Sequence, residues 1–112
     1  MDKRYSRFDD FWDHYLREHA APQTRQMHFM ATTASLSIAA SGLLVGRYIL
    51  LLLAVIVGYG IAWLSHFVVE RNKPLTWEYP WFSLLAEFKL FFLMAAGRID
   101  EDVARALSRP PL

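Results

Sequence analysis

The stretch YILLLLAVIVGYGIAWLSHFVV, which spans Tyr48–Val69, decides the fold of this chain. It contains no Lys, Arg, Asp or Glu in 22 residues, and its first half is almost entirely Leu, Ile, Val and Ala. A helix of about 20 apolar residues crosses the hydrocarbon core of a bilayer, which is about 30 Å thick. We therefore expect a membrane-spanning helix over residues 48–70. The alternative is a helix buried in the core of a soluble protein.

Another uncharged stretch precedes this one. No Lys, Arg, Asp or Glu occurs between Arg25 and Arg47, a gap of 21 residues, but Ala, Ser, Thr and Gly are frequent there. Small residues of this kind suit a helix that packs closely against another helix in lipid. We expect the N-terminal span over residues 28–46, joined to the other span by a short turn near Gly46, so that the two helices form a hairpin.

Length and composition limit the chain to one small domain. It has 112 residues, of which 54% are hydrophobic and 15% aromatic, and a soluble domain of this size has little interior for so many apolar side chains. The net charge of +1 gives no reason to expect nucleic acid as a partner. The absence of cysteine excludes disulfides, thiolate zinc sites and thiol nucleophiles. The fold class that we predict is all-α, with residues 1–112 forming a single membrane domain.

The basic residues predict the orientation of the hairpin. Five Lys and Arg residues precede the N-terminal span and six follow the other span, whereas the connecting turn has only Arg47. Because Lys and Arg accumulate on the cytoplasmic side of a membrane protein, we expect both termini to be cytoplasmic. The expected protein is an integral membrane protein surrounded by membrane lipid. Its small-residue faces also predict a homo-oligomer.

The segments that flank the hairpin have amphipathic patterns. Residues 6–20 predict an interfacial helix whose aromatic stripe lies on the membrane or caps the hairpin; the stripe consists of Phe8, Phe11, Trp12, Tyr15 and Leu16. Residues 81–97 are apolar but contain Glu87 and Lys89, which favours an amphipathic or re-entrant helix over a third span. Residues 98–112 predict a polar tail that forms a short helix at most.

Two of the four histidines occupy equivalent positions in the hairpin. His28 lies nineteen residues before Arg47 and His66 lies nineteen residues after it, so a hairpin that turns there places both at the same depth, near the cytoplasmic surface. Each also extends a row of mostly small residues at helical spacing, the kind of face that lets helix backbones approach. These rows are Thr32, Ser35, Ala39 and Gly42 in one helix and Ala54, Gly58 and Ala62 in the other.

A third histidine and a carboxylate fall near the same surface. His19 lies at the stripe angle of the N-terminal helix, and the loop after it is short enough to hold it near His28, whereas His14 lies off the stripe. Glu70 lies one turn beyond His66, on the same helix face. Imidazole and carboxylate ligands suit iron, zinc, copper or manganese. We predict a metal site of His19, His28 and His66. The simpler interpretation of each histidine is a hydrogen-bonding anchor at the membrane interface.

Other charged and aromatic residues have two interpretations each. Arg25, Arg71 and Lys73 either hold the chain against anionic headgroups or bind a carboxylate or phosphate head near the site. Glu87 is either a partner that orients a ligating histidine or a solvated residue. The aromatic residues that follow the hairpin predict an interfacial belt rather than a binding pocket; they are Trp77, Tyr79 and Trp81.

Two blocks of the sequence resemble a known family. The first block is Tyr15-Leu16-Arg17-Glu18-His19 followed by Pro22, Arg25 and His28, and the second is His66-Phe67, Glu70, Asn72-Lys73-Pro74, Tyr79-Pro80 and Ser83. Together they are similar to the small membrane-protein family that includes the fungal 2-hydroxy fatty acid dioxygenase of phytosphingosine breakdown. The resemblance covers residues 8–97. The chain departs mildly from the family pattern around Trp81 and Glu87, and it resembles the bacterial members in being short.

The resemblance implies an iron(II)-dependent α-oxidation, in which a 2-hydroxy fatty acid reacts with O2 and is shortened by one carbon. It implies His19, His28 and His66 as iron ligands, with Glu70 as a fourth ligand or as a residue that orients one. On this basis we expect Arg25 to pair with the substrate carboxylate, and we expect a bacterial inner membrane as the location. Two rival functions stay open, a non-enzymatic membrane scaffold and a lipid hydrolase that uses zinc in place of iron.

Overall fold

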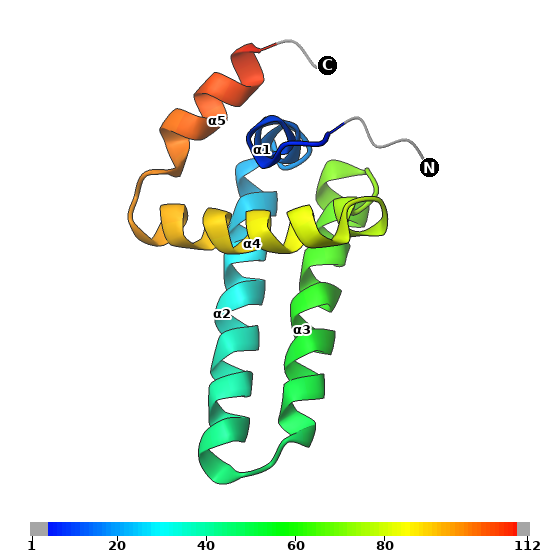
Figure 1. Cartoon of the computed structure of the whole chain (residues 1–112), viewed down its shortest axis with the longest axis vertical. Helices are drawn as coiled ribbons and strands as arrows, with labels where there is room; N and C mark the ends of the chain where they lie inside the picture. Colours follow the sequence, from blue (N-terminus) through cyan, green and yellow to red (C-terminus); the bar gives the residue numbers. More distant parts are fainter. Residues whose placement is uncertain (1–4, 110–112) are drawn as a thin grey trace.

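The structure is a computed structural model, described here for residues 5–109, and within that range it is helical with no strand. The predicted all-α fold class is confirmed. Figure 1 shows a long hairpin of α2 and α3, with α1, α4 and α5 gathered at one end of it. The helices are α1 (Phe8–Arg17), α2 (Pro22–Val45), α3 (Ile49–Ser65), α4 (Pro80–Ala95) and α5 (Ile99–Ser108). A π-helical segment, His66–Glu70, continues α3, and a short 3-10 helix, Leu75–Trp77, precedes α4.

The ends of α2 follow from its sequence. The helix begins at Pro22, six residues before the expected start of the span, because proline at a first helical position has a suitable φ and needs no hydrogen bond from its nitrogen. It ends at Gly46, whose φ of 73° is the left-handed conformation that glycine adopts readily. Arg47 N–H then donates to the carbonyl of Gly42 at 2.9 Å, and α3 begins two residues later.

The small-residue rows of α2 and α3 meet in the hairpin. Ser35 Oγ donates to the carbonyl of Ala54 at 2.9 Å, and a Cβ built on Gly58 would lie 3.2 Å from Ser35 Cβ. The two helices are therefore so close that a larger residue at Gly58 would require the Ser35 side chain to shift by a few tenths of an ångström. The small-residue rows pack against each other within one chain. The hairpin itself therefore accounts for the small-residue faces from which we predicted a homo-oligomer.

The outward faces of the hairpin are apolar and uncovered. Residues Pro22–Val45 and Ile49–Glu70 are each long and apolar enough to cross a membrane, yet only 22% of the most apolar window of each is buried inside the protein. Exposed side chains include Leu44 and Ile49 near the turn. A soluble protein rarely exposes an apolar surface of this extent. The arrangement therefore argues against the soluble alternative and favours lipid as the surroundings.

The remaining helices form a compact group at the other end, which we call the cap. The stripe of α1 is buried inside the cap, with Phe11 and Leu16 at 0% exposure, so this helix caps the hairpin instead of laying its aromatic residues on lipid. Figure 1 shows α4 lying across the hairpin. The opposite side of α4 carries exposed Trp81, Leu85 and Phe92, an apolar face suited to the membrane interface.

Helix α5 lies in the segment that we expected to be a polar tail. Its buried residues Ile99, Val103 and Ala106 recur at helical spacing and complete the core of the cap. Polar contacts then join it to α1: Trp12 Nε1–H donates to Asp102 at 2.8 Å. Only three of its ten residues are buried, and the charged residues between them give the segment the pattern of a polar tail.

Candidate metal centre

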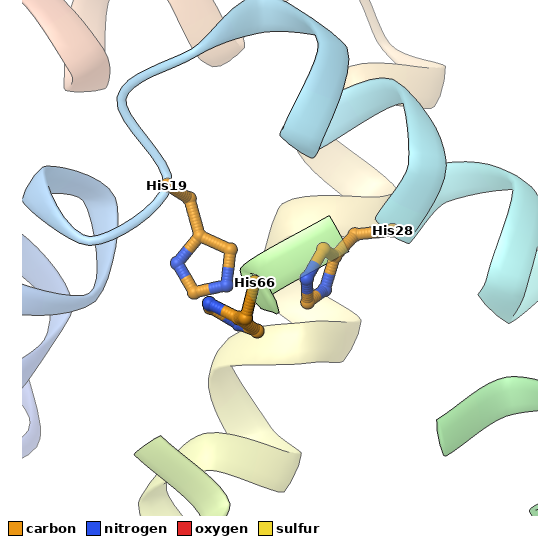
Figure 2. Close-up of side chains that lie close together, drawn as sticks. All are labelled: His19, His28 and His66. Carbon is orange, nitrogen blue, oxygen red and sulfur yellow. The ribbon is translucent and has the colours of Figure 1, made fainter. Parts of the chain in front are cut away.

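Three histidines converge where the hairpin meets the cap. His19 comes from the loop after α1, His28 from the first half of α2, and His66 from the start of the π-helical segment. Figure 2 shows the three rings pointing toward one another. One ligand nitrogen from each ring lies within 4.8 Å of the others, and the three residues are 0%, 2% and 2% exposed. His14, which we expected to lie off the stripe, is not among these three and stacks on the ring of Tyr5, at 5.0 Å between ring centroids.

Each of the three imidazoles is held through its Nδ1 atom. His19 Nδ1–H donates to the carbonyl of Tyr15 at 2.6 Å, His28 Nδ1–H donates to the carboxylate of Glu87 at 2.8 Å, and His66 Nδ1–H donates to Asn72 Oδ1 at 2.7 Å. All three partners are acceptors, so each Nδ1 carries the proton. In its neutral form, a ring with the proton on Nδ1 keeps a lone pair on Nε2, which is the state that binds a metal ion.

Asn72 orients His66 through a network that fixes its own amide. Asn72 Nδ2 donates to the carbonyl of Glu18 at 3.0 Å, so Oδ1 is the atom that faces the imidazole. The backbone N–H of Asn72 also donates to the carbonyl of His66. We did not predict a role for Asn72 from the sequence, although it lies in the second family block, six residues after His66.

Glu87 joins three helices at the centre. Its carboxylate, from α4, accepts the hydrogen bond from His28 on α2 and another from the hydroxyl of Tyr15 on α1, at 2.8 Å. Burial, followed by the nearby charge of Glu87, raises the pKa of Tyr15 well above its ordinary value, so the phenol keeps the proton that it donates. Of the two interpretations of Glu87, the structure shows the partner that orients a histidine. The Tyr15 ring also stacks on His19, at 3.9 Å between ring centroids.

The electrostatics of the centre keep His19 neutral. Burial, followed by the neighbouring His28 and His66, lowers the pKa of His19 well below its ordinary value, and the Tyr15 carbonyl only partly offsets this. The Nε2 atoms of His19 and His28 are buried and make no hydrogen bond. Such atoms are rare in proteins because desolvating them without a partner is costly. A metal ion is the partner that would satisfy them.

The donor set fits a divalent transition metal. Two nitrogens that share one ion at about 2.1 Å lie no more than about 4.2 Å apart. The three ligand nitrogens lie within 4.8 Å of one another, so they need to move together by roughly an ångström to bind one ion. Imidazole nitrogens suit iron, zinc and copper alike, so the ligands alone do not select among them.

The structure places Glu70 and Arg25 outside the group of ligand atoms. Glu70 accepts a hydrogen bond from the backbone N–H of Ala21 at 2.7 Å, and Arg25 Nη1 donates to the carbonyls of His19 and Ala20, both at 2.8 Å. We expected Glu70 to act as a ligand or to orient one, but the structure shows its carboxylate bonded to the backbone of the loop that carries His19. Both side chains thus hold this loop.

A cavity of about 220 Å³ extends from the imidazoles between α2, α3 and α4. Tyr15 and Glu87 line its polar end together with the three histidines. Away from them the lining is mostly apolar, and it includes Leu36 and Val55, which are 41% and 52% exposed on the outside of the hairpin. The cavity thus has a polar inner end and an apolar end open to the surroundings of the hairpin, a shape suited to a molecule with one polar head and one apolar tail.

Comparison with known proteins agrees with this geometry. The family model described as "2-hydroxy-palmitic acid dioxygenase Mpo1-like" matches residues 5–99. No curated protein and no solved structure matches the chain. The matched region includes all three converging histidines and the residues that hold them, and it confirms the resemblance inferred from the two sequence blocks. The chain therefore belongs to the family of 2-hydroxy-palmitic acid dioxygenase Mpo1-like proteins.

Proposed function

We propose that the protein is an iron(II)-dependent dioxygenase that shortens 2-hydroxy fatty acids by one carbon at a membrane interface. The observation that carries this proposal is the meeting of three imidazoles, each protonated at Nδ1, at the polar end of an apolar cavity. The family description adds the reaction class and names a 2-hydroxy acid with a long alkyl chain.

The side chains divide the work between holding the ion and orienting its ligands. His19, His28 and His66 would bind iron through Nε2, and Glu87 and Asn72 would keep two of these rings in the correct tautomer. Bound iron(II) supplies the redox chemistry that lets O2 react with a 2-hydroxy acid. Groups that fix the rings in this way commonly strengthen metal binding by ten- to a hundredfold.

The reaction balances without a further reactant. A 2-hydroxy acid and O2 give the acid that is one carbon shorter, CO2 and water. In that balance the bond between the carboxyl carbon and the hydroxyl-bearing carbon breaks, and the substrate supplies every electron that O2 accepts. No separate reductant is consumed in turnover, so the protein needs no bound nicotinamide or flavin.

The cavity suits a substrate that arrives from the membrane. A polar head reaches the imidazoles, while the tail leaves past Leu36 and Val55 into lipid. The three helices of the cap share one end of the hairpin, and the basic residues flank the spans on that side, so the site would face the cytoplasm. A bacterial inner membrane remains the location that we expect.

The decisive experiment is incubation of the purified, iron-loaded protein with 2-hydroxypalmitic acid and O2, followed by mass analysis of the products. We expect the acid that is one carbon shorter as the product. Palmitic acid, which lacks the 2-hydroxyl group, is the control substrate and should give no shortened acid. Metal analysis of the same preparation separates the rivals. Tightly held zinc with no shortened product would favour the hydrolase, and a folded protein without metal would favour the scaffold.

A further inference from the structure

Two more buried polar atoms without a partner line the cavity beside the imidazoles. They are Nε1 of Trp63 and Oγ of Ser83, which is only 5% exposed. Native proteins leave few such atoms unsatisfied, and each one calls for an explanation. Neither residue belongs to the network that holds the histidines.

Both residues lie one helical turn from the metal centre. Trp63 precedes His66 by three residues on α3, and Ser83 precedes Glu87 by four residues on α4. Residues at these spacings share a helix face. An edge-to-face contact with Trp77, at 5.8 Å between ring centroids, holds the indole of Trp63 in place. The two donors therefore flank the polar end of the cavity from two different helices.

Within residues 5–109, no lysine or arginine lines this cavity. Arg25, which we expected to pair with a substrate carboxylate, donates instead to two backbone carbonyls of the loop that carries His19. The carboxylate of Glu87 is already engaged by Tyr15 and His28. Among the residues that the structure describes, an acidic head group in this cavity would thus meet histidines and neutral donors but no lysine or arginine.

We propose that Trp63 Nε1–H and Ser83 O–H donate hydrogen bonds to the carboxylate head of the fatty acid. This inference rests on the proposed function and deepens it by assigning the residues that bind the head group. An indole N–H can only donate, so the ligand atom opposite Trp63 must be an acceptor. The carboxylate is the acceptor-rich end of a fatty acid, and hydrogen bonds to an ionised acceptor are stronger than those between neutral groups.

The test is the binding of 2-hydroxypalmitic acid to the full chain in detergent, kept free of O2 so that no turnover occurs. Trp63→Phe and Ser83→Ala each remove one donor and keep most of the packing. Each should weaken binding about tenfold, which corresponds to about 1.4 kcal/mol. Ser83→Thr keeps the hydroxyl and should bind the acid almost as the unaltered chain does. The methyl ester lacks the charge, so its weaker binding should change little in either variant.

Two matched controls lie away from the cavity. Trp81→Phe alters an indole that is 77% exposed, and Ser41→Ala removes a hydroxyl that bonds to the carbonyl of Ser37; neither should change the affinity. Unchanged affinity in both Trp63→Phe and Ser83→Ala, with thermal unfolding as in the unaltered chain, would overturn the head-group assignment. Metal analysis of the same samples judges the dioxygenase proposal separately. Normal metal content with unchanged affinity rejects only the head-group contacts, whereas an unaltered chain that binds no metal rejects the dioxygenase.

Discussion

Small residues have different effects in the two halves of the hairpin: near the turn they allow close helix packing, and toward the cap they line a cavity. Near the turn, a Cβ built on Gly42 would lie 2.8 Å from Leu50 Cβ, so the helices there leave no room between them. Toward the cap, Ala31 and Ala62 line a cavity of about 220 Å³. One pair of helices is thus closed at one end and open at the other.

The two halves differ in which other helices pack against the hairpin. The closed half has only its two helices, whose contact sets their relative depth. The open half has α4 against it, and α4 contributes Glu87 to the metal centre and Ser83 to the cavity. Close packing at the turn therefore places His28 opposite His66, while the cap completes the site around them. The predictions below test this separation between a structural half and a chemical half.

The largest effect is expected when two ligands of the chemical half are removed together. His28→Ala combined with His66→Ala deletes two of three imidazoles, so bound iron and the shortened product should fall to background. Metal analysis and product mass analysis measure these losses. His14→Ala is the control, because that ring stacks on Tyr5 away from the centre. Iron retained by the double variant at the unaltered level would remove the basis for the proposed site.

A smaller loss is expected when the residue behind one ligand is changed. Glu87→Ala removes the acceptor of both His28 Nδ1–H and the Tyr15 hydroxyl. Metal affinity should fall about ten- to a hundredfold. Glu87→Gln keeps one acceptor oxygen, so its metal affinity should lie between those of the unaltered chain and Glu87→Ala. Competition with a chelator of known affinity measures the change, and equal affinity in all three proteins would show that Glu87 does not support the ion.

In the structural half, crowding should reduce stability and spare the ligands. Gly42→Val forces a side chain against Leu50 and the carbonyl of Arg47, so the free energy of unfolding should fall by about 1–3 kcal/mol. Gly60→Ala is the matched control, since a Cβ there meets nothing within 4 Å. Denaturant titration in detergent measures stability, and metal analysis should still find one ion per folded chain. Loss of metal from a folded Gly42→Val variant would contradict the separation of the two halves.

The smallest effect concerns the contact between α1 and α5 in the cap. Burial acts to raise the pKa of Asp102, but hydrogen bonds from Trp12 and Arg105 outweigh it and lower the pKa below its ordinary value. A carboxylate with a lowered folded-state pKa stabilises the fold above its unfolded-state pKa, near 3.9, and that contribution is lost as pH falls through the lower folded-state value. The loss should be below about 1 kcal/mol for a group near the surface. Asp102→Asn should flatten the dependence of unfolding on pH in this acidic range, and an unaltered profile would contradict the assignment.

Much of the hairpin could be predicted because its signals are long and regular. Two uncharged stretches gave the spans, and equal distances from Arg47 gave the common depth of His28 and His66. The position of His19 followed from a short loop, which leaves the chain little freedom. These inferences need only helix geometry and the length of the chain.

The parts that could not be predicted depend on local irregularity or on contacts distant in sequence. Glu70 accepts a hydrogen bond from the backbone of Ala21, 49 residues away in the sequence, and the hydropathy pattern does not predict such a contact. The engagement of Arg25 with backbone carbonyls depends on the path of a loop. The role of Glu87 depends on how α4 docks, 59 residues along the chain from His28. The cytoplasmic side of the termini stays a prediction.

X-ray absorption spectroscopy of the iron-loaded protein tests the central claim most directly, because it reports the atoms around the metal. The account predicts one iron ion per chain surrounded by imidazole nitrogens, with a third of that imidazole signal lost in His19→Ala. Iron coordinated without imidazole, or a spectrum that is identical in His19→Ala, would contradict it.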